Sequence, residues 1–259
     1  MADLEKAAGA PVLLCATRAE AAPIVARLKV RARIPGTPRY VLWGRLDGRE
    51  PVIVGVSGMG GTAAAELTQW VYDALTPSCL IWFGVAGGLA PALKSADLVI
   101  PAKVRIHPDP FNYQPAAALR ELLVETARRS GHAPGETALI QVGDVIASAA
   151  AKARAGEEGC ADACDMESGD FARVASRLPV PWAVIRSIFD PVSDNLPPIA
   201  GDLLDDRGGL RPLPALREFL KSPGAMLGLR KRNQMAMAAL TPVLLEGVRG
   251  FARQQAAGS

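Results

Sequence analysis

The sequence has few residues of the kinds that build metal sites, disulfide frameworks and membrane spans. Its 259 residues include only four cysteines and two histidines. Cys160 and Cys164 have no second Cys or His pair near them, so no metal site is expected. Thiols this sparse indicate reduced cysteines. Charged residues or prolines interrupt every apolar stretch before it reaches about 18 residues, so no membrane-spanning helix is expected.

An excess of one charge sign is also missing from the chain as a whole. There are 29 basic and 26 acidic residues, a formal net charge of +3, which does not imply a nucleic-acid partner. Asp3 and Glu5 stand where a secretory signal has basic residues, so no targeting peptide is expected and a cytoplasmic location is predicted. The charge is uneven, however. From Arg207 onward, nine basic and two acidic residues give +7, which leaves −4 for the first 206 residues.

The composition, 49% hydrophobic and 21% charged, is typical of a globular domain. Short apolar runs alternate with Ala-rich amphipathic stretches, which predicts one α/β domain with a mainly parallel sheet. Strands are expected at 12–15, 40–46, 52–56, 79–85, 97–101, 138–142 and 182–189, and helices at 18–29, 62–75, 116–129, 147–155 and 166–177. Residues 190–214 are rich in Pro, Gly and Asp and predict a long loop before a helical tail with apolar stretches at 213–220, 222–232 and 235–248.

The glycine-rich segment Gly55-Val-Ser-Gly-Met-Gly-Gly61 follows a predicted strand and opens a predicted helix. A dinucleotide site would need a ribose-binding acid at the end of the next strand, where this chain has Trp82-Phe-Gly-Val-Ala-Gly-Gly88. A nicotinamide cofactor is therefore not expected, and no other cofactor is predicted. The glycines either form a tight turn between strand and helix or shape a small-molecule pocket.

Four further segments occur in a specific order: Gly84-Val-Ala-Gly-Gly-Leu89, Asp97-Leu-Val-Ile-Pro101, Cys164-Asp-Met-Glu-Ser168 and Ile185-Arg-Ser-Ile-Phe-Asp190. Together they resemble the nucleoside phosphorylase and nucleosidase superfamily, and more narrowly the methylthioadenosine/S-adenosylhomocysteine nucleosidases. The resemblance covers about residues 12–190 and includes Ala16-Thr-Arg-Ala-Glu20 and Ser57-Gly-Met-Gly60. It implies a three-layer α/β/α fold around a central mixed, partly barrel-like sheet.

The resemblance also implies cleavage of an N-ribosidic bond, in which a ribosyl cation forms while negative charge builds on the departing purine. Asp190 would be the general acid that protonates the purine, with a raised pKa. Glu167 would accept hydrogen bonds from the ribose hydroxyls, with Met166 against the sugar. Glu20 would activate water. From the residues alone, Asp190 also suits a cap before Pro191, and Glu20 a solvated helix residue. Asp165 and Glu167 both suit the first turn of a helix.

The remaining predicted substrate contacts also come from the resemblance. Ile146 is expected to stack on the base, in a segment whose backbone meets the adenine edge and which includes Val145 and Ala147. The other predicted contacts are Thr17, Ser57, Val85, Ala86, Gly87 and Phe189. Two of these depart from the nucleosidases, since Val85 replaces a small hydroxyl residue and Phe189 replaces the Ser before the catalytic Asp. These departures concern the substrate and not the reaction.

Hydrolysis is favoured over phosphorolysis, because a phosphate dianion in a dry pocket needs arginines and other donors. The phosphorylases carry an Arg-x-Gly-Ser segment where this chain has Trp82-Phe-Gly-Val85, and their early Gly-Asp-Pro-x-Arg segment is absent here. Arg18 and Arg186 keep phosphorolysis open as an alternative. A non-catalytic adenosine- or lipid-binding protein on the same fold is the third possibility.

About 70 residues follow Asp190, more than the nucleosidases have, so the chain divides into a core at 1–190 and a basic extension of the same domain at 191–259. This extension resembles that of the hopanoid-associated branch of the superfamily, which implies removal of adenine from adenosylhopane, a lipid-linked adenosine. The basic segment is expected either to rest on the anionic inner face of a membrane or to pack on its own domain or a second subunit. The superfamily resemblance makes a homo-oligomer the default.

Overall fold

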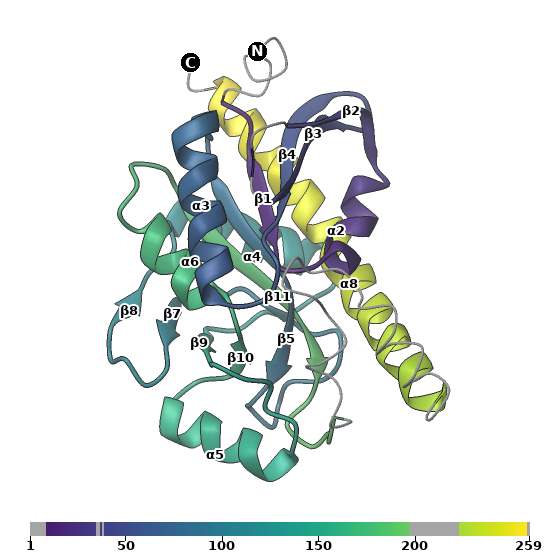
Figure 1. Cartoon of the computed structure of the whole chain (residues 1–259), viewed down its shortest axis with the longest axis vertical. Coiled ribbons are helices and arrows are strands. Elements are labelled where there is room, and N and C mark those ends of the chain that lie inside the picture. The colour runs from purple at the N-terminus through teal and green to yellow at the C-terminus, as the bar shows by residue number, and fades with distance from the viewer. Residues whose placement is uncertain (1–8, 35–36, 38, 197–222, 258–259) are drawn as a thin grey trace.

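The computed structural model describes residues 9–34, 37, 39–196 and 223–257. They form a mixed sheet with helices on both faces, which confirms the predicted three-layer α/β/α architecture (Figure 1). The strands are β1 (Val12–Cys15), β2 (Leu28–Arg33), β3 (Tyr40–Leu46), β4 (Glu50–Val56), β5 (Leu80–Gly88), β6 (Leu98–Val99), β7 (Lys103–Ile106), β8 (Asn112–Tyr113), β9 (Ala138–Gln141), β10 (Ala163–Asp165) and β11 (Trp182–Asp190). The helices are α2 (Arg18–Val25), α3 (Gly61–Leu75), α4 (Ala117–Arg129), α5 (Ala149–Gly159), α6 (Ser168–Ala175) and α8 (Pro223–Ala257).

The nine-residue strand β5 organises the sheet. Strand β11 runs parallel to it along one edge from Leu80 to Gly87. The other edge is shared, because β1 pairs in parallel with the first part of β5 and β10 pairs antiparallel with its end at Gly87 and Gly88. From there the sheet continues through β9, β7 and β8 on one side and through β4, β3 and β2 on the other. This change of partner along a single strand brings segments far apart in sequence to the end of β5.

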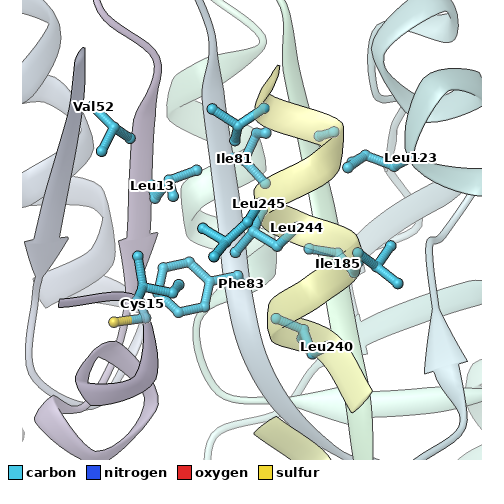
Figure 2. Packing of buried hydrophobic residues seen from close by; sticks show 14 of the residues in the cluster. Leu13, Cys15, Val52, Ile81, Phe83, Leu123, Ile185, Leu240, Leu244 and Leu245 are labelled. Carbon is cyan, nitrogen blue, oxygen red and sulfur yellow. The ribbon is translucent and has the colours of Figure 1, made fainter. Parts of the chain in front are cut away.

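Alternation along the buried strands sends neighbouring side chains to opposite faces of the sheet. Leu13, Ile81 and Phe83 belong to the cluster covered by α2, α4 and α8, and Figure 2 shows them packed against the α8 side chains. Their neighbours Leu14 and Trp82 belong to the cluster on the opposite face, beneath α3 and α6. The continuous apolar runs in the sequence are therefore strands that are buried on both faces.

The second half of α8 is part of this core. Leu240, Val243, Leu244 and Val248 are fully buried, and Leu240, Leu244 and Leu245 belong to the same core cluster as Ile185 and Leu123 (Figure 2). By length and composition alone, residues 227–257 could cross a membrane, and this is the one such helix in the described chain. Because 56% of its most apolar window is buried inside the protein, its apolar character is that of a core helix.

Several predicted boundaries are wrong. The helix expected at 18–29 ends at Val25, and Leu28–Arg33 forms β2, whose alternating apolar and basic residues suit an edge strand. The short strands β7, β8 and β10 were not predicted, because two to four residues carry too little periodicity. The tail forms one continuous helix, α8, from Pro223 to Ala257. The predicted stretch at 213–220 and the loop beyond residue 196 lie outside the described residues.

Candidate active site

The predicted site residues gather at one edge of the sheet. Strands β1, β4, β5 and β11 run parallel, so their carboxyl ends meet there. The segments that follow or end these strands contain Thr17, Ser57, Gly87 and Asp190. Strand β10 runs antiparallel to β5 and ends two residues before Glu167, which lies at the same edge of the sheet. Carboxyl ends of parallel strands are where ligands bind in open α/β sheets.

Glu20 lies in the first turn of α2, where a capping box fixes it. The Thr17 hydroxyl accepts a hydrogen bond from the Glu20 N–H, and Glu20 Oε2 accepts hydrogen bonds from the Thr17 N–H at 2.8 Å and the Thr17 hydroxyl at 3.0 Å. Its other oxygen, Oε1, accepts one from the Val85 N–H at 2.9 Å. Glu20 is only 3% exposed, so the solvated alternative is wrong for this residue.

Arg186 lies on β11 with its guanidinium wholly buried, and three carboxylates surround it. Nη2 forms an ion pair with Asp165 and lies 3.6 Å from Glu167 Oε2, while Nη1 lies 3.9 Å from Glu20 Oε1. The guanidinium also donates hydrogen bonds to the Ser168 hydroxyl at 3.2 and 3.3 Å. One cation thus faces three buried acids, which leaves this part of the site with an excess of negative charge.

This excess acts on Glu167. Its Oε1 accepts a hydrogen bond from the Gly60 N–H at 2.9 Å, which ties the glycine-rich turn to the acid. Burial, followed by the negative charge of Asp165, raises the pKa of Glu167 from 4.5 to about 7, against the lowering effect of Arg186. Glu167 therefore changes its protonation state close to neutral pH.

The backbone of β5 has to pass close to this cluster. Gly84 has a φ of +148°, and a Cβ atom there would overlap Glu20 Oε1 and Arg186 Nη1. A glycine is required at this position for both reasons. The carboxylate cluster thus explains why the first residue of this motif, Gly84, is a glycine.

A β-bulge at the end of β11 determines where Asp190 lies. Ile188 pairs with Ala86 and Asp190 with Gly87, so Phe189 is the extra residue between them. Without the bulge, Asp190 would stand opposite Gly88, one residue beyond the site. Phe189 itself is half-buried, and no described contact places its side chain against the other predicted site residues.

Asp190 is 4% exposed and forms an ion pair with a buried lysine, Lys152 of α5. Burial raises the pKa of the Asp190 carboxyl above its ordinary value, and the hydrogen bond and charge of Lys152 act in the opposite direction. Asp190 is therefore a buried carboxyl of the kind that can hold a proton, and the simple loop cap considered from sequence does not account for its lysine partner.

The acid and the Arg186 cluster lie beside the same strand. Glu20 is bound to the backbone of Val85, and Asp190 stands opposite Gly87, two residues further along β5. At about 3.3 Å per residue these anchor points are ~7 Å apart along the strand. The two carboxyl environments therefore lie about two residues apart along β5.

The remaining predicted contacts are positioned less tightly. Ile146 is half-buried and packs on Leu89, Ile140 and Cys164, and the Cys164 side chain in turn lies near Gly87. Val145 is 36% exposed.

The carbonyl of Ala147 accepts a hydrogen bond from the Leu196 N–H at 2.8 Å, so that backbone oxygen already has a partner. Ala86 is buried and pairs with Ile188, and it belongs to the core cluster beneath α3 and α6. Met166 is half-buried before Glu167, and the buried Ser57 hydroxyl donates to the Gly58 carbonyl.

Three residues of the site have roles that sequence reasoning missed. No sequence pattern singles out Lys152, and the sequence predicts Asp165 only as a favourable residue at a helix start. Arg186 is predicted only as a possible phosphate ligand. The acid-rich segment around Asp165 could have suggested a buried cation partner, whereas Lys152 lies in an Ala-rich stretch with no signal of its own.

The architecture and the site define a class: a three-layer α/β/α protein whose parallel strands end at a cluster of buried carboxyl groups. The chain belongs to the Phosphorylase superfamily, whose family model matches residues 12–206. It is 33% identical over 171 residues to the 5'-methylthioadenosine/S-adenosylhomocysteine nucleosidase of Shewanella loihica, covering 60% of this chain and 74% of that protein. The corresponding Halalkalibacterium halodurans protein is 32% identical over 167 residues, covering 57% of this chain and 70% of its own length.

Solved structures show the same fold. The 5'-methylthioadenosine/S-adenosylhomocysteine nucleosidase of Neisseria meningitidis, in complex with methylthio-immucillin-A, superposes with a TM-score of 0.75 at 19% identity, covering 93% of this chain and 99% of that one. A futalosine hydrolase mutant of Helicobacter pylori gives 0.71 at 21% identity, covering 92% and 99%. At these identities the likeness concerns the fold alone.

Proposed function

We propose that this protein hydrolyses the N-ribosidic bond of an adenine nucleoside and releases adenine. The observation that carries the proposal is the presence of two different carboxyl environments beside one strand. Near Val85, Glu20 and Glu167 share the charge of Arg186 with Asp165. Beside Gly87, Asp190 is buried with a raised pKa.

These two environments match the two charges that develop when the bond breaks. A cluster with surplus negative charge favours the positive charge on the ribosyl group. A carboxyl that retains its proton can give it to the purine as the bond electrons move onto the base. Asp190 is accordingly proposed as the general acid, Glu20 as the base that takes a proton from water, and Glu167 as the acceptor for ribose hydroxyls. The similarity to the 5'-methylthioadenosine/S-adenosylhomocysteine nucleosidases of Shewanella loihica and Halalkalibacterium halodurans supports this assignment.

Hydrolysis is preferred over phosphorolysis because of the surroundings of Arg186 and Arg18, the two candidate phosphate ligands. Arg186 is bound by three carboxylates, which would repel a phosphate dianion. Arg18 is exposed, with its guanidinium 5.0 Å from the centre of the Tyr40 ring, a cation–π contact.

We further propose that the ribose 5′ substituent is hydrophobic, with adenosylhopane as the specific candidate. Support comes from the first half of α8, which carries the exposed apolar residues Leu227 (57%) and Met235 (47%) beside the exposed Arg230 and Lys231. Arg232 of the same helix pairs with Asp194 at 2.6 Å, four residues after Asp190. This apolar and basic stretch therefore adjoins the loop that follows the proposed acid. Contact of this stretch with an anionic membrane and assembly into a homo-oligomer remain predictions.

The test is incubation of the protein with adenosylhopane, 5′-methylthioadenosine and adenosine, each with and without phosphate. The proposal expects adenine and a free sugar product without phosphate, with adenosylhopane giving the highest kcat/KM. A strict requirement for phosphate with formation of a sugar 1-phosphate would establish a phosphorylase instead. Adenine binding without any turnover would point to a non-catalytic protein.

A further inference from the structure

Lys152 is an unusual residue because it is a lysine with only 1% of its side chain exposed. Its Nζ contacts Asp190 Oδ2 and donates to the carbonyl oxygens of Pro191 at 3.0 Å and Asp194 at 2.8 Å. These are three acceptors, and an ammonium has three N–H groups where a neutral amine has two. The surroundings therefore fit a charged ammonium that donates to two carbonyl oxygens and forms an ion pair with one carboxylate oxygen.

The helix that carries Lys152 is fixed to the loop after Asp190. Ser148 caps α5 by accepting a hydrogen bond from the Ala151 N–H at 3.2 Å. Asn195 Oδ1 accepts one from the Ala149 N–H at 2.9 Å, and the Leu196 N–H donates to the Ala147 carbonyl. The loop and the first turn of α5 thus form one hydrogen-bonded unit, and Lys152 lies between that unit and the carboxyl group.

Four charged or titratable groups face Asp190 from the elements around it. They are Lys152 from α5, Asp194 from its own loop, Arg232 from α8 and Cys164 from β10. Burial raises the pKa of the Cys164 thiol to about 12, so the thiol is neutral. Arg232 is partly exposed and paired with Asp194, so these two charges largely offset each other. In the described part of the chain, Lys152 is the buried cation in direct contact with the acid.

We propose that Lys152 is the positioning residue for Asp190: it holds the carboxyl beside Gly87 and sets the upper pH limit at which Asp190 still carries a proton for the departing base. The inference rests on the proposed role of Asp190 as general acid. Burial alone would make this carboxyl hold its proton too strongly to release it during the reaction, because proton donation works best when the affinity of the acid for its proton matches the working pH. The ammonium counters that effect through the carboxylate oxygen with which it pairs.

The test replaces Lys152 and follows kcat/KM for 5′-methylthioadenosine against pH. In Lys152→Met, loss of the cation should move the alkaline limb of the profile to higher pH by about one to three units, while the maximum falls. Lys152→Gln removes the charge but retains N–H donors for the loop carbonyls, so it gives the same shift if Met disturbs folding. Lys152→Arg retains the charge and should keep the limb near its wild-type position. A purely structural role would lower the maximum without moving the limb.

The matched control is Arg154→Gln, which removes a positive charge from the exposed face of the same helix and should leave the limb in place. A readout independent of turnover is the infrared C=O band of the protonated Asp190 carboxyl, which is identified by subtracting the spectrum of Asp190→Asn. The band is followed against pH in the wild-type protein and in Lys152→Gln. The band should persist to higher pH without the lysine. A folded Lys152→Gln protein with an unmoved band and limb would overturn the inference. Absence of base release with a shifted band would refute the proposed function while leaving the charge coupling intact.

Discussion

The ionisation of the single residue Glu167 is predicted to make the free energy of unfolding depend on pH. Its pKa rises from 4.5 to about 7 in the folded protein, mainly because it is buried and close to Asp165. A raised folded-state pKa contributes stability that is fully present below pH 4.5 and is lost as the pH rises through about 7. At about 1.4 kcal/mol per pKa unit, the loss amounts to about 3 kcal/mol.

The perturbation is Glu167→Gln, which retains an oxygen for the Gly60 N–H but cannot ionise. The free energy of unfolding of this variant, relative to wild type, should increase by about 3 kcal/mol between pH 4.5 and pH 8.5. The assay is urea unfolding followed by tryptophan fluorescence at several pH values. Because the difference between two proteins is measured, titration of all other groups cancels to first order.

Glu125→Gln serves as the control, since Glu125 is an exposed glutamate on α4 and the same exchange is made there away from the buried carboxylates. A flat profile for Glu167→Gln would refute the argument that burial dominates at this site. A variant that loses stability relative to wild type as the pH rises would show that attraction to Arg186, 3.6 Å away, outweighs burial and the charge of Asp165.

Three other predictions concern positioning and partners. Gly84→Ala should cost about 1–3 kcal/mol of stability and abolish base release, because the added Cβ would overlap Glu20 and Arg186 at a positive φ. The control in thermal unfolding is Gly135→Ala, since a Cβ atom at Gly135 has no neighbour within 4 Å. Thr17→Val should cost about 1 kcal/mol in urea unfolding through loss of the capping box, and an unchanged midpoint would contradict that role. If the exposed part of α8 contacts membranes, replacing both Arg230 and Lys231 with Gln should abolish co-sedimentation with vesicles of anionic phospholipid. Equal binding of the wild-type protein and this double variant would refute the membrane contact.

Much of the fold can be predicted from the sequence because the central strands of the sheet are buried on both faces. Continuous apolar runs such as 12–15 and 182–189 carry that signal without help from the rest of the chain. The strand at 28–33 does not, since it alternates apolar and basic residues directly after a helix. Strands of two to four residues, such as β8 and β10, are defined by their pairing partners and not by local periodicity.

The proposed acidic residues can likewise be predicted from the sequence, because they lie within recognisable segments. The cations that pair with them cannot, because those ion pairs form only through tertiary contacts. Arg186 meets Glu20 and Asp165 only once β1, β10 and β11 lie side by side with β5. Lys152 becomes buried because a loop about 40 residues further along the chain supplies two carbonyl oxygens. The basic tail illustrates the same limit, since the sequence does not reveal that Arg232, Arg249 and Arg253 form ion pairs with acidic residues of the protein.

The central claim is that Asp190 protonates a departing adenine while water attacks the sugar. The most direct measurement is adenine release from 5′-methylthioadenosine in phosphate-free buffer by the wild-type protein, Asp190→Asn and Glu20→Gln. We expect release by wild type with a free sugar product, and a fall of at least about 100-fold in kcat for each variant, because each has lost a general acid or base. Undiminished release by Asp190→Asn, or release by wild type only when phosphate is added, would contradict it.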